Sequence, residues 1–202
     1  MSDAGDSVAS TYQDTIKDVN DVDEAVISIS SDDDVTIADV DTLTHWSNCS
    51  ERFRVIKRQV ATDNRIEWNL PPLTIANNSE ATIAHCRQII DNVLSHGYIS
   101  CFKVGISYLP YDRFVSAPFS YTRSGYDRMI LICIHDDASF VAEMEKSLLR
   151  VYRRSGRHGC VNSSGHPLCA NVNPGGENAY CGWAPHFVYV VFKSSKRSVR
   201  VR

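Results

Sequence analysis

The sequence lacks any long apolar run. No segment approaches the ~18 apolar residues of a membrane-spanning helix, and the N-terminal MSDAGDSV has neither the basic start nor the apolar stretch of a signal peptide. The chain also has no Cys-x-x-Cys pair and no internal repeat. We therefore expect an intracellular protein with no membrane partner, whose seven cysteines are reduced thiols rather than a disulfide framework.

Basic and aromatic side chains are scarce in residues 1–45. This segment holds twelve acidic residues, one lysine and a single tyrosine, Tyr12. So few large apolar groups cannot offset the entropy of ordering the chain, which predicts a disordered acidic tail. Residues 46–202 instead hold twenty basic and twelve acidic side chains and are long enough for one globular domain. This basic body favours a nucleic-acid partner, although solvated surface charge would give the same excess.

One apolar segment interrupts the acidic tail. In DEAVISISSDDD, the side chains of Val26, Ile27 and Ile29 precede three aspartates. An extended segment of this kind can add to the edge of a sheet, with its acids against a basic rim. It resembles a SUMO-interaction motif, which implies a SUMO partner through residues 26–34 and a nuclear location. A solvated tail with no partner is the alternative.

Hydrophobic periodicity predicts an α/β (α+β) fold for the body, with a small mixed or antiparallel sheet flanked by helices. The helices are too few to cover both faces of a parallel sheet. The pattern predicts a basic hairpin over 53–70, helices over 79–95 and 137–154, a short helix near 109–114, and strands over 99–107, 127–135 and 186–192. Ser79 is the predicted N-cap of the first long helix, and Asp136 or Asp137 that of the second.

Four polar or glycine positions follow one another in a suggestive order. Gly105 closes a strand, Arg113 follows a proline turn, Glu145 precedes Leu-Leu on a helix, and Asn162 lies in the loop beyond. The stretches VGISYLPYDR and EKSLLRVYRR resemble the second motif and the catalytic helix of the GIY-YIG endonucleases. The resemblance covers roughly residues 100–192 and implies a GIY-YIG-like domain.

The resemblance implies a hydrolase that cuts phosphodiester bonds of nucleic acid. Such chemistry needs a divalent ion, a cation for developing negative charge, and a base for the attacking water. By the resemblance, Glu145 would bind Mg²⁺ or Mn²⁺, Arg113 would stabilise the pentacovalent phosphate and Asn162 would brace the site. One carboxylate suffices for a Mg²⁺ ion that keeps most of its waters.

Two departures from the family pattern yield further candidates. The family's tyrosine-bearing first strand is absent before residue 99, and the 186–192 strand would supply it as Tyr189 if the domain is circularly permuted. That hypothesis requires this strand to lie beside residues 101–106. Lys103 stands where the second motif has a tyrosine, so we count it with the catalytic candidates. A fold that binds nucleic acid without cutting it is the alternative.

Simpler readings exist for the same residues. Arg113 would pair with Asp112 or Asp137 if it were only structural, and Glu143 is an alternative to Glu145. A zinc site in the downstream loop is unlikely, because its soft ligands are irregularly spaced: His158, Cys160, His166, Cys169 and Cys181. A protein-interaction module that acts through the acidic tail, with no catalysis, is the competing function.

Overall fold

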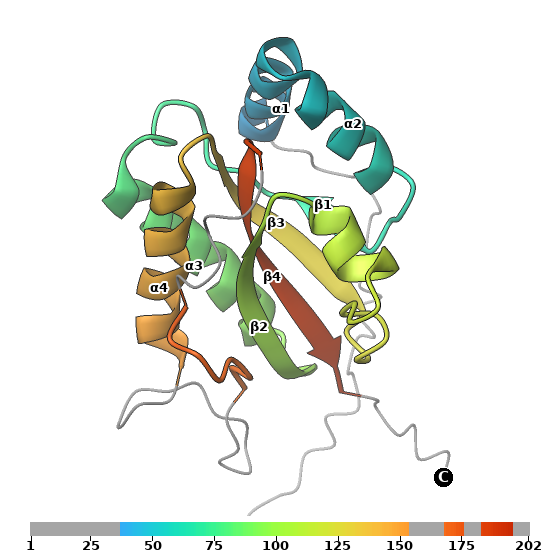
Figure 1. Ribbon diagram of the computed structural model, residues 1–202. Helices are drawn as coiled ribbons and strands as arrows, with labels where there is room; N and C mark the ends of the chain where they lie inside the picture. The colour runs from blue at the N-terminus through green and yellow to red at the C-terminus, as the bar shows by residue number, and fades with distance from the viewer. Residues whose placement is uncertain (1–36, 154–167, 176–182, 196–202) are drawn as a thin grey trace, which may run out of the picture. The chain divides into compact units, whose positions relative to one another are not determined.

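The computed structural model of the chain describes residues 37–153, 168–175 and 183–195. The chain divides into residues 1–34 and Val35–Arg202, and every described residue belongs to the second unit. Figure 1 shows that unit as a twisted sheet with helices on either side. The fold is therefore mixed α/β, as the sequence predicts.

Four strands form one mixed sheet in the order β1-β3-β4-β2. They are β1 (Ile66–Trp68), β2 (Ile99–Ser107), β3 (Arg128–His135) and β4 (His186–Ser194). Strand β4 pairs antiparallel with both β2 and β3, whereas β1 pairs parallel with β3. The last strand in the sequence thus lies in the middle of the sheet.

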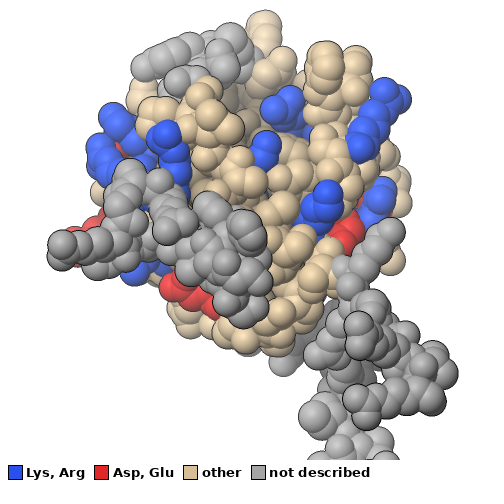
Figure 2. Space-filling view, turned by 90° about the horizontal axis from the view of Figure 1, so that it is seen from below, with Lys and Arg blue, Asp and Glu red and all other residues tan. Residues whose placement is uncertain are grey.

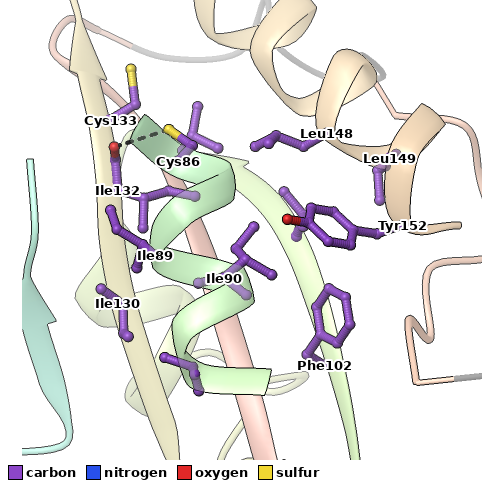
Figure 3. Close-up of a cluster of buried hydrophobic side chains, with 14 of the residues drawn as sticks. Cys86, Ile89, Ile90, Phe102, Ile130, Ile132, Cys133, Leu148, Leu149 and Tyr152 are labelled. Atoms are coloured by element: carbon purple, nitrogen blue, oxygen red, sulfur yellow. Dashed lines mark hydrogen bonds between the residues drawn. The ribbon is translucent and has the colours of Figure 1, made fainter. Parts of the chain in front are cut away.

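Helices α3 (Ser79–Ser95) and α4 (Ala138–Tyr152) cover one face of the sheet. Figure 3 shows how Ile90 of α3 and Leu148 of α4 point into the same apolar cluster as Ile130 and Ile132 of β3. The Cys86 thiol is fully buried there and donates a hydrogen bond to the carbonyl of Ile132 at 3.2 Å. Burial raises the pKa of this thiol, which keeps it protonated, and the described cysteines are all free.

The opposite face of the sheet packs against α1 (Ile37–Cys49), α2 (Glu51–Val60) and a short π-helical turn, η1 (Asp112–Ser116). Helix α2 buries Phe53, Ile56 and Val60, one side of an amphipathic helix. The ring of Phe53 stacks on that of Phe187 from β4, with 6.3 Å between centroids. This second core is what holds β4 from the side opposite α3 and α4.

The predicted hairpin over 53–70 is wrong, because residues 51–60 form helix α2 and only three residues of β1 are extended. Alternating apolar residues suggested a strand, yet Phe53, Ile56 and Val60 also fit helical spacing. The decisive local signal is Ser50, whose hydroxyl accepts a hydrogen bond from the Phe53 amide at 3.1 Å and caps the helix.

Two predicted boundaries also shift. Helix α1 begins at Ile37, so the folded body starts inside the segment predicted to be a disordered tail over 1–45. Helix α3 is capped by the Asn78 side chain, which accepts from the Ala81 amide at 3.0 Å, and not by Ser79. The prediction for the second helix is confirmed, since Asp137 caps α4. No helix in the described ranges is both long and apolar enough to cross a membrane.

Candidate active site

A cavity of about 510 Å³ opens along β2, the strand at one edge of the sheet. Five residues that the sequence singled out line it: Lys103, Gly105, Arg113, Glu145 and Tyr189. Arg113 and Tyr189 belong to the face of the sheet that η1 covers and Glu145 comes from α4 on the other face, so the cavity is lined from both faces along β2. Asn162 lies outside the described residues, as do Val26, Ile27 and Ile29 of the acidic tail.

The pairing of β2 with β4 builds the centre of the cavity. Gly105 and Tyr189 are direct partners in the antiparallel register, so the strand with the candidate tyrosine does lie beside residues 101–106. The Tyr189 side chain crosses over the glycine: a Cβ atom on Gly105 would stand 2.5 Å from the Tyr189 hydroxyl oxygen. The glycine is therefore needed for the space that the tyrosine ring occupies.

Arg113 is held by the π-helical turn that follows β2. The Ser107 hydroxyl accepts from the Leu109 amide at 3.0 Å and turns the chain, and the Arg113 amide then donates to the Leu109 carbonyl at 3.1 Å. Phe114 is fully buried in the second core and fixes the turn to the sheet. Single π-helical turns of this kind often occur at functional sites.

The loop after η1 brings a second tyrosine to Arg113. The Tyr121 amide donates to the Arg113 carbonyl at 3.2 Å, and the Arg113 guanidinium lies over the Tyr121 ring, 5.2 Å from its centroid. The hydroxyl oxygens of Tyr121 and Tyr189 are 3.1 Å apart, within hydrogen-bond distance. One guanidinium and two phenols thus form a connected group in the cavity wall.

Burial and the neighbouring groups set the protonation of this cluster. Burial raises the pKa of Tyr189 well above its ordinary value and Tyr121 raises it further, although the Arg113 charge favours the phenolate. For Arg113, burial acts to lower the pKa, but the two phenols outweigh it and the net direction is upward. At neutral pH the cavity therefore holds a protonated Tyr189 beside a fully charged Arg113.

Glu145 is a buried carboxylate, with 7% of its surface exposed. It lies on α4 and lines the cavity, whereas Glu143 is exposed and pairs with Arg150 at 3.3 Å, which removes it as the alternative. Gly175, with φ at +87°, approaches Glu145 closely: a Cβ atom there would lie 3.2 Å from Glu145 Oε2. Carboxyl side chains are almost never fully buried unless they are paired, and this one lines the same cavity as Arg113.

Arg113 does not have the simple structural role considered above. Among the described residues it forms no ion pair with Asp112 or Asp137. Asp137 instead caps α4 through its bond to the Ser139 amide, at 2.8 Å. The guanidinium is directed to the phenols and the cavity.

Sequence analysis missed Asn171, which fixes another wall of the cavity. Its side-chain amide pairs with the backbone of Val104 as a neighbouring strand would: Nδ2 donates to the Val104 carbonyl at 2.8 Å, and Oδ1 accepts from the Val104 amide at 3.0 Å. The Phe102 amide and carbonyl bond to Leu168 and Ala170, both at 2.8 Å. Residues 168–171 therefore follow the outer edge of β2 and lead to Gly175.

Replacing Asn171 with alanine is expected to destabilise the protein by about 1–3 kcal/mol, because the Val104 amide and carbonyl lose their partners. Urea unfolding of Asn171→Ala, compared with the exposed control Asn92→Ala, measures the difference. Equal stability of Asn171→Ala and the unsubstituted protein would show that this wall is held by other contacts.

His186 is a further residue that the sequence did not single out. It opens β4, lines the cavity and is 7% exposed. Burial lowers the pKa of its imidazole, and the positive charge of Arg52 lowers it further, against the opposing effect of Asp136 and Asp137. The ring is therefore neutral at pH 7 and able to accept a proton or a hydrogen bond.

The donor set in the cavity fits one kind of metal ion. The described residues contain no group of three His, Cys, Asp or Glu side chains placed to hold a metal. A single carboxylate such as Glu145 suits Mg²⁺ or Mn²⁺ that keeps most of its water ligands. Of the five residues considered for zinc, only Cys169 lies in the described part, where its thiol donates to Asn171 Oδ1 at 3.6 Å.

Comparison with known proteins returns no match: no family model, no curated protein and no solved structure matches the chain. The function must therefore be argued from the cavity itself.

Proposed function

We propose that this protein is a metal-dependent endonuclease, with a GIY-YIG-like site in which the tyrosine-bearing strand comes last in the sequence. One observation carries the proposal. The β2–β4 pairing sets Tyr189 against Gly105, in the same cavity as Arg113 and Glu145. Residues selected from the sequence for their chemistry, and separated along the chain, would rarely converge by chance.

The chemistry of the cavity suits hydrolysis of a phosphodiester. Arg113 is a fixed cation beside the space where negative charge would develop on phosphate oxygens, and its order comes from the buried Phe114 next to it. Lys103 adds a second positive side chain on the same wall. A divalent ion bound at Glu145 would neutralise phosphate charge and lower the pKa of a bound water.

Two side chains in the cavity can interact with the attacking water, one by orienting it and one by accepting its proton. The Tyr189 hydroxyl keeps its proton at neutral pH, so it serves to orient the water by accepting a hydrogen bond rather than as a ready phenolate. The neutral imidazole of His186 is able to take up a proton at that pH. The cavity therefore offers an orienting group and a proton acceptor on the same strand, β4.

Surface charge agrees with a nucleic-acid substrate. On the face shown in Figure 2, Lys and Arg side chains are spread widely among the described residues and Asp and Glu are fewer. Cationic side chains spread over a surface attract a polyanion before chemistry begins. In the acidic tail, the apolar residues Val26, Ile27 and Ile29 would bind SUMO or another protein, as a function separate from this site.

The full chain should cut plasmid, single-stranded or branched DNA, or RNA, in Mg²⁺ or Mn²⁺ and not in EDTA. Arg113→Gln is expected to lower kcat by about a hundredfold, because one preorganised donor to the developing charge is lost. Arg123→Gln, in the exposed part of the neighbouring loop, is the matched control. Failure to cut any of these substrates, with both proteins folded, contradicts the proposal.

A further inference from the structure

Arg52 is an arginine that the proposed chemistry does not use. It lies on α2, outside the region that resembles the endonucleases. Its guanidinium stands over the ring of Tyr108, 5.2 Å from the centroid, and Tyr108 lines the cavity. Helix α2 thus brings a cation to the rim of the site.

The hydrogen-bonding state of Arg52 is unusual. Its Nε atom is buried and has no hydrogen-bond partner among the described residues. Within the same part of the chain Arg52 joins no ion pair, whereas Arg54, two residues along, pairs with Glu51. Arg52 is therefore held by its contact with the Tyr108 ring, and no ion pair among the described residues neutralises its charge.

The charge of Arg52 also reaches into the cavity. It lowers the pKa of His186, which shares the cavity with Arg113 and Tyr189. The groups that oppose it there are Asp136 and Asp137, and both act on His186 more weakly than Arg52 does. Arg52 therefore stands close enough to the His186 side of the cavity for its charge to act there.

We propose that Arg52 and the adjacent cavity rim, at Tyr108 and His186, bind a second phosphate of the nucleic-acid backbone, next to the one held by Arg113. The inference rests on the proposed function, because it assumes a polynucleotide in the cavity. Arginine suits the task, since its planar fork donates two hydrogen bonds to phosphate oxygens and the aromatic ring beneath keeps it in place. Arg52 is then a substrate-positioning residue supplied by α2.

The test is equilibrium binding of a fluorescent DNA duplex and of the single strand to the full chain in EDTA, over a range of salt concentrations. Arg52→Gln is expected to weaken binding and to reduce the slope of log K against log[salt] by about 0.9 for duplex or about 0.7 for single strand, the loss of one phosphate contact. Arg54→Gln, which faces away from Arg52 on the same helix, should leave the slope unchanged. Arg52→Lys should restore much of the slope, because a point charge still binds phosphate.

Kinetics provide the second readout. Arg52→Gln should raise KM with little change in kcat, as expected for a contact made equally in the ground and transition states. Thermal unfolding of each variant shows that it is folded. An unchanged salt slope in folded Arg52→Gln, or an equal change in Arg54→Gln, overturns the inference while leaving the nuclease proposal intact. A changed slope in a protein that cuts nothing supports the Arg52 site and contradicts the nuclease; no binding by the unsubstituted chain overturns both.

Discussion

Replacing Glu145 with glutamine is expected to abolish metal-dependent cutting, with a fall in kcat on the order of a thousandfold. Glutamine has nearly the same shape, so the buried position beside Gly175 remains filled. What is lost is the negative charge that would hold a divalent ion. Cutting rates in saturating Mg²⁺ and the affinity for Mn²⁺, measured by titration calorimetry, should fall together.

The matched control is Glu143→Gln, two residues earlier on the same helix. Glu143 is exposed and pairs with Arg150 and Lys146, so its loss should leave both cutting and metal affinity unchanged. Full activity in Glu145→Gln would contradict the assignment of this carboxylate as the metal ligand. A loss of activity with unchanged metal affinity would move the metal to other ligands and contradict the role given to Glu145.

Adding a methyl group at Gly105 should lower both the activity and the stability of the protein. In Gly105→Ala the new Cβ would stand 2.5 Å from the Tyr189 hydroxyl oxygen and 2.7 Å from the ring carbon that carries it. Because Tyr189 is fully buried between two strands, its ring cannot simply swing away. We expect a loss of about 1–3 kcal/mol in the free energy of unfolding and about a hundredfold lower kcat, since the hydroxyl is displaced.

A double-mutant cycle separates this contact from a general effect on β2. Gly105 does not have a left-handed φ, so alanine is unfavourable there for lack of space and not for backbone strain. Tyr189→Leu removes the ring, and Gly105→Ala should cost much less in that background. Urea unfolding of the four proteins gives the coupling energy, expected at about 0.5–3 kcal/mol. A coupling energy of zero would refute the close approach of these two residues.

Strands and helices with one strong pattern were predictable from the sequence. The run ISCFKVGIS gave the bounds of β2, Ile99–Ser107, and HFVYVVF gave most of β4. Pairing between these two strands was inferred only from a resemblance, because no local pattern states which strands are neighbours. The strand predicted for residues 53–60 was wrong because their apolar spacing is compatible with both a strand and a helix. The N-cap at Ser50 favours the helix.

Residues of the cavity that stand in a sequence motif could be predicted, whereas residues that reach the cavity only through tertiary contacts could not. Arg113 and Glu145 were singled out because they stand in stretches that resemble family motifs, and Tyr189 because the resemblance requires a tyrosine-bearing strand that is missing before residue 99. Tyr121 and Asn171 lie in irregular segments, and they join the cavity through bonds to residues far away in the sequence, Tyr189 and Val104. The place of Arg52 beside Tyr108 depends on α2 being a helix, which the predicted hairpin over 53–70 did not allow for.

The central place of β4 in the sheet determines when the cavity can form during synthesis. This strand supplies partners to β2 and β3 and contributes Phe187 and Tyr189 to one core, Val188 and Val190 to the other. During synthesis the sheet cannot close until residues through Ser194 have left the ribosome, because until then two strands lack their shared neighbour. A nascent or truncated chain would therefore be without the Tyr189 side of the cavity, so the cavity can be complete only in molecules whose translation has passed β4.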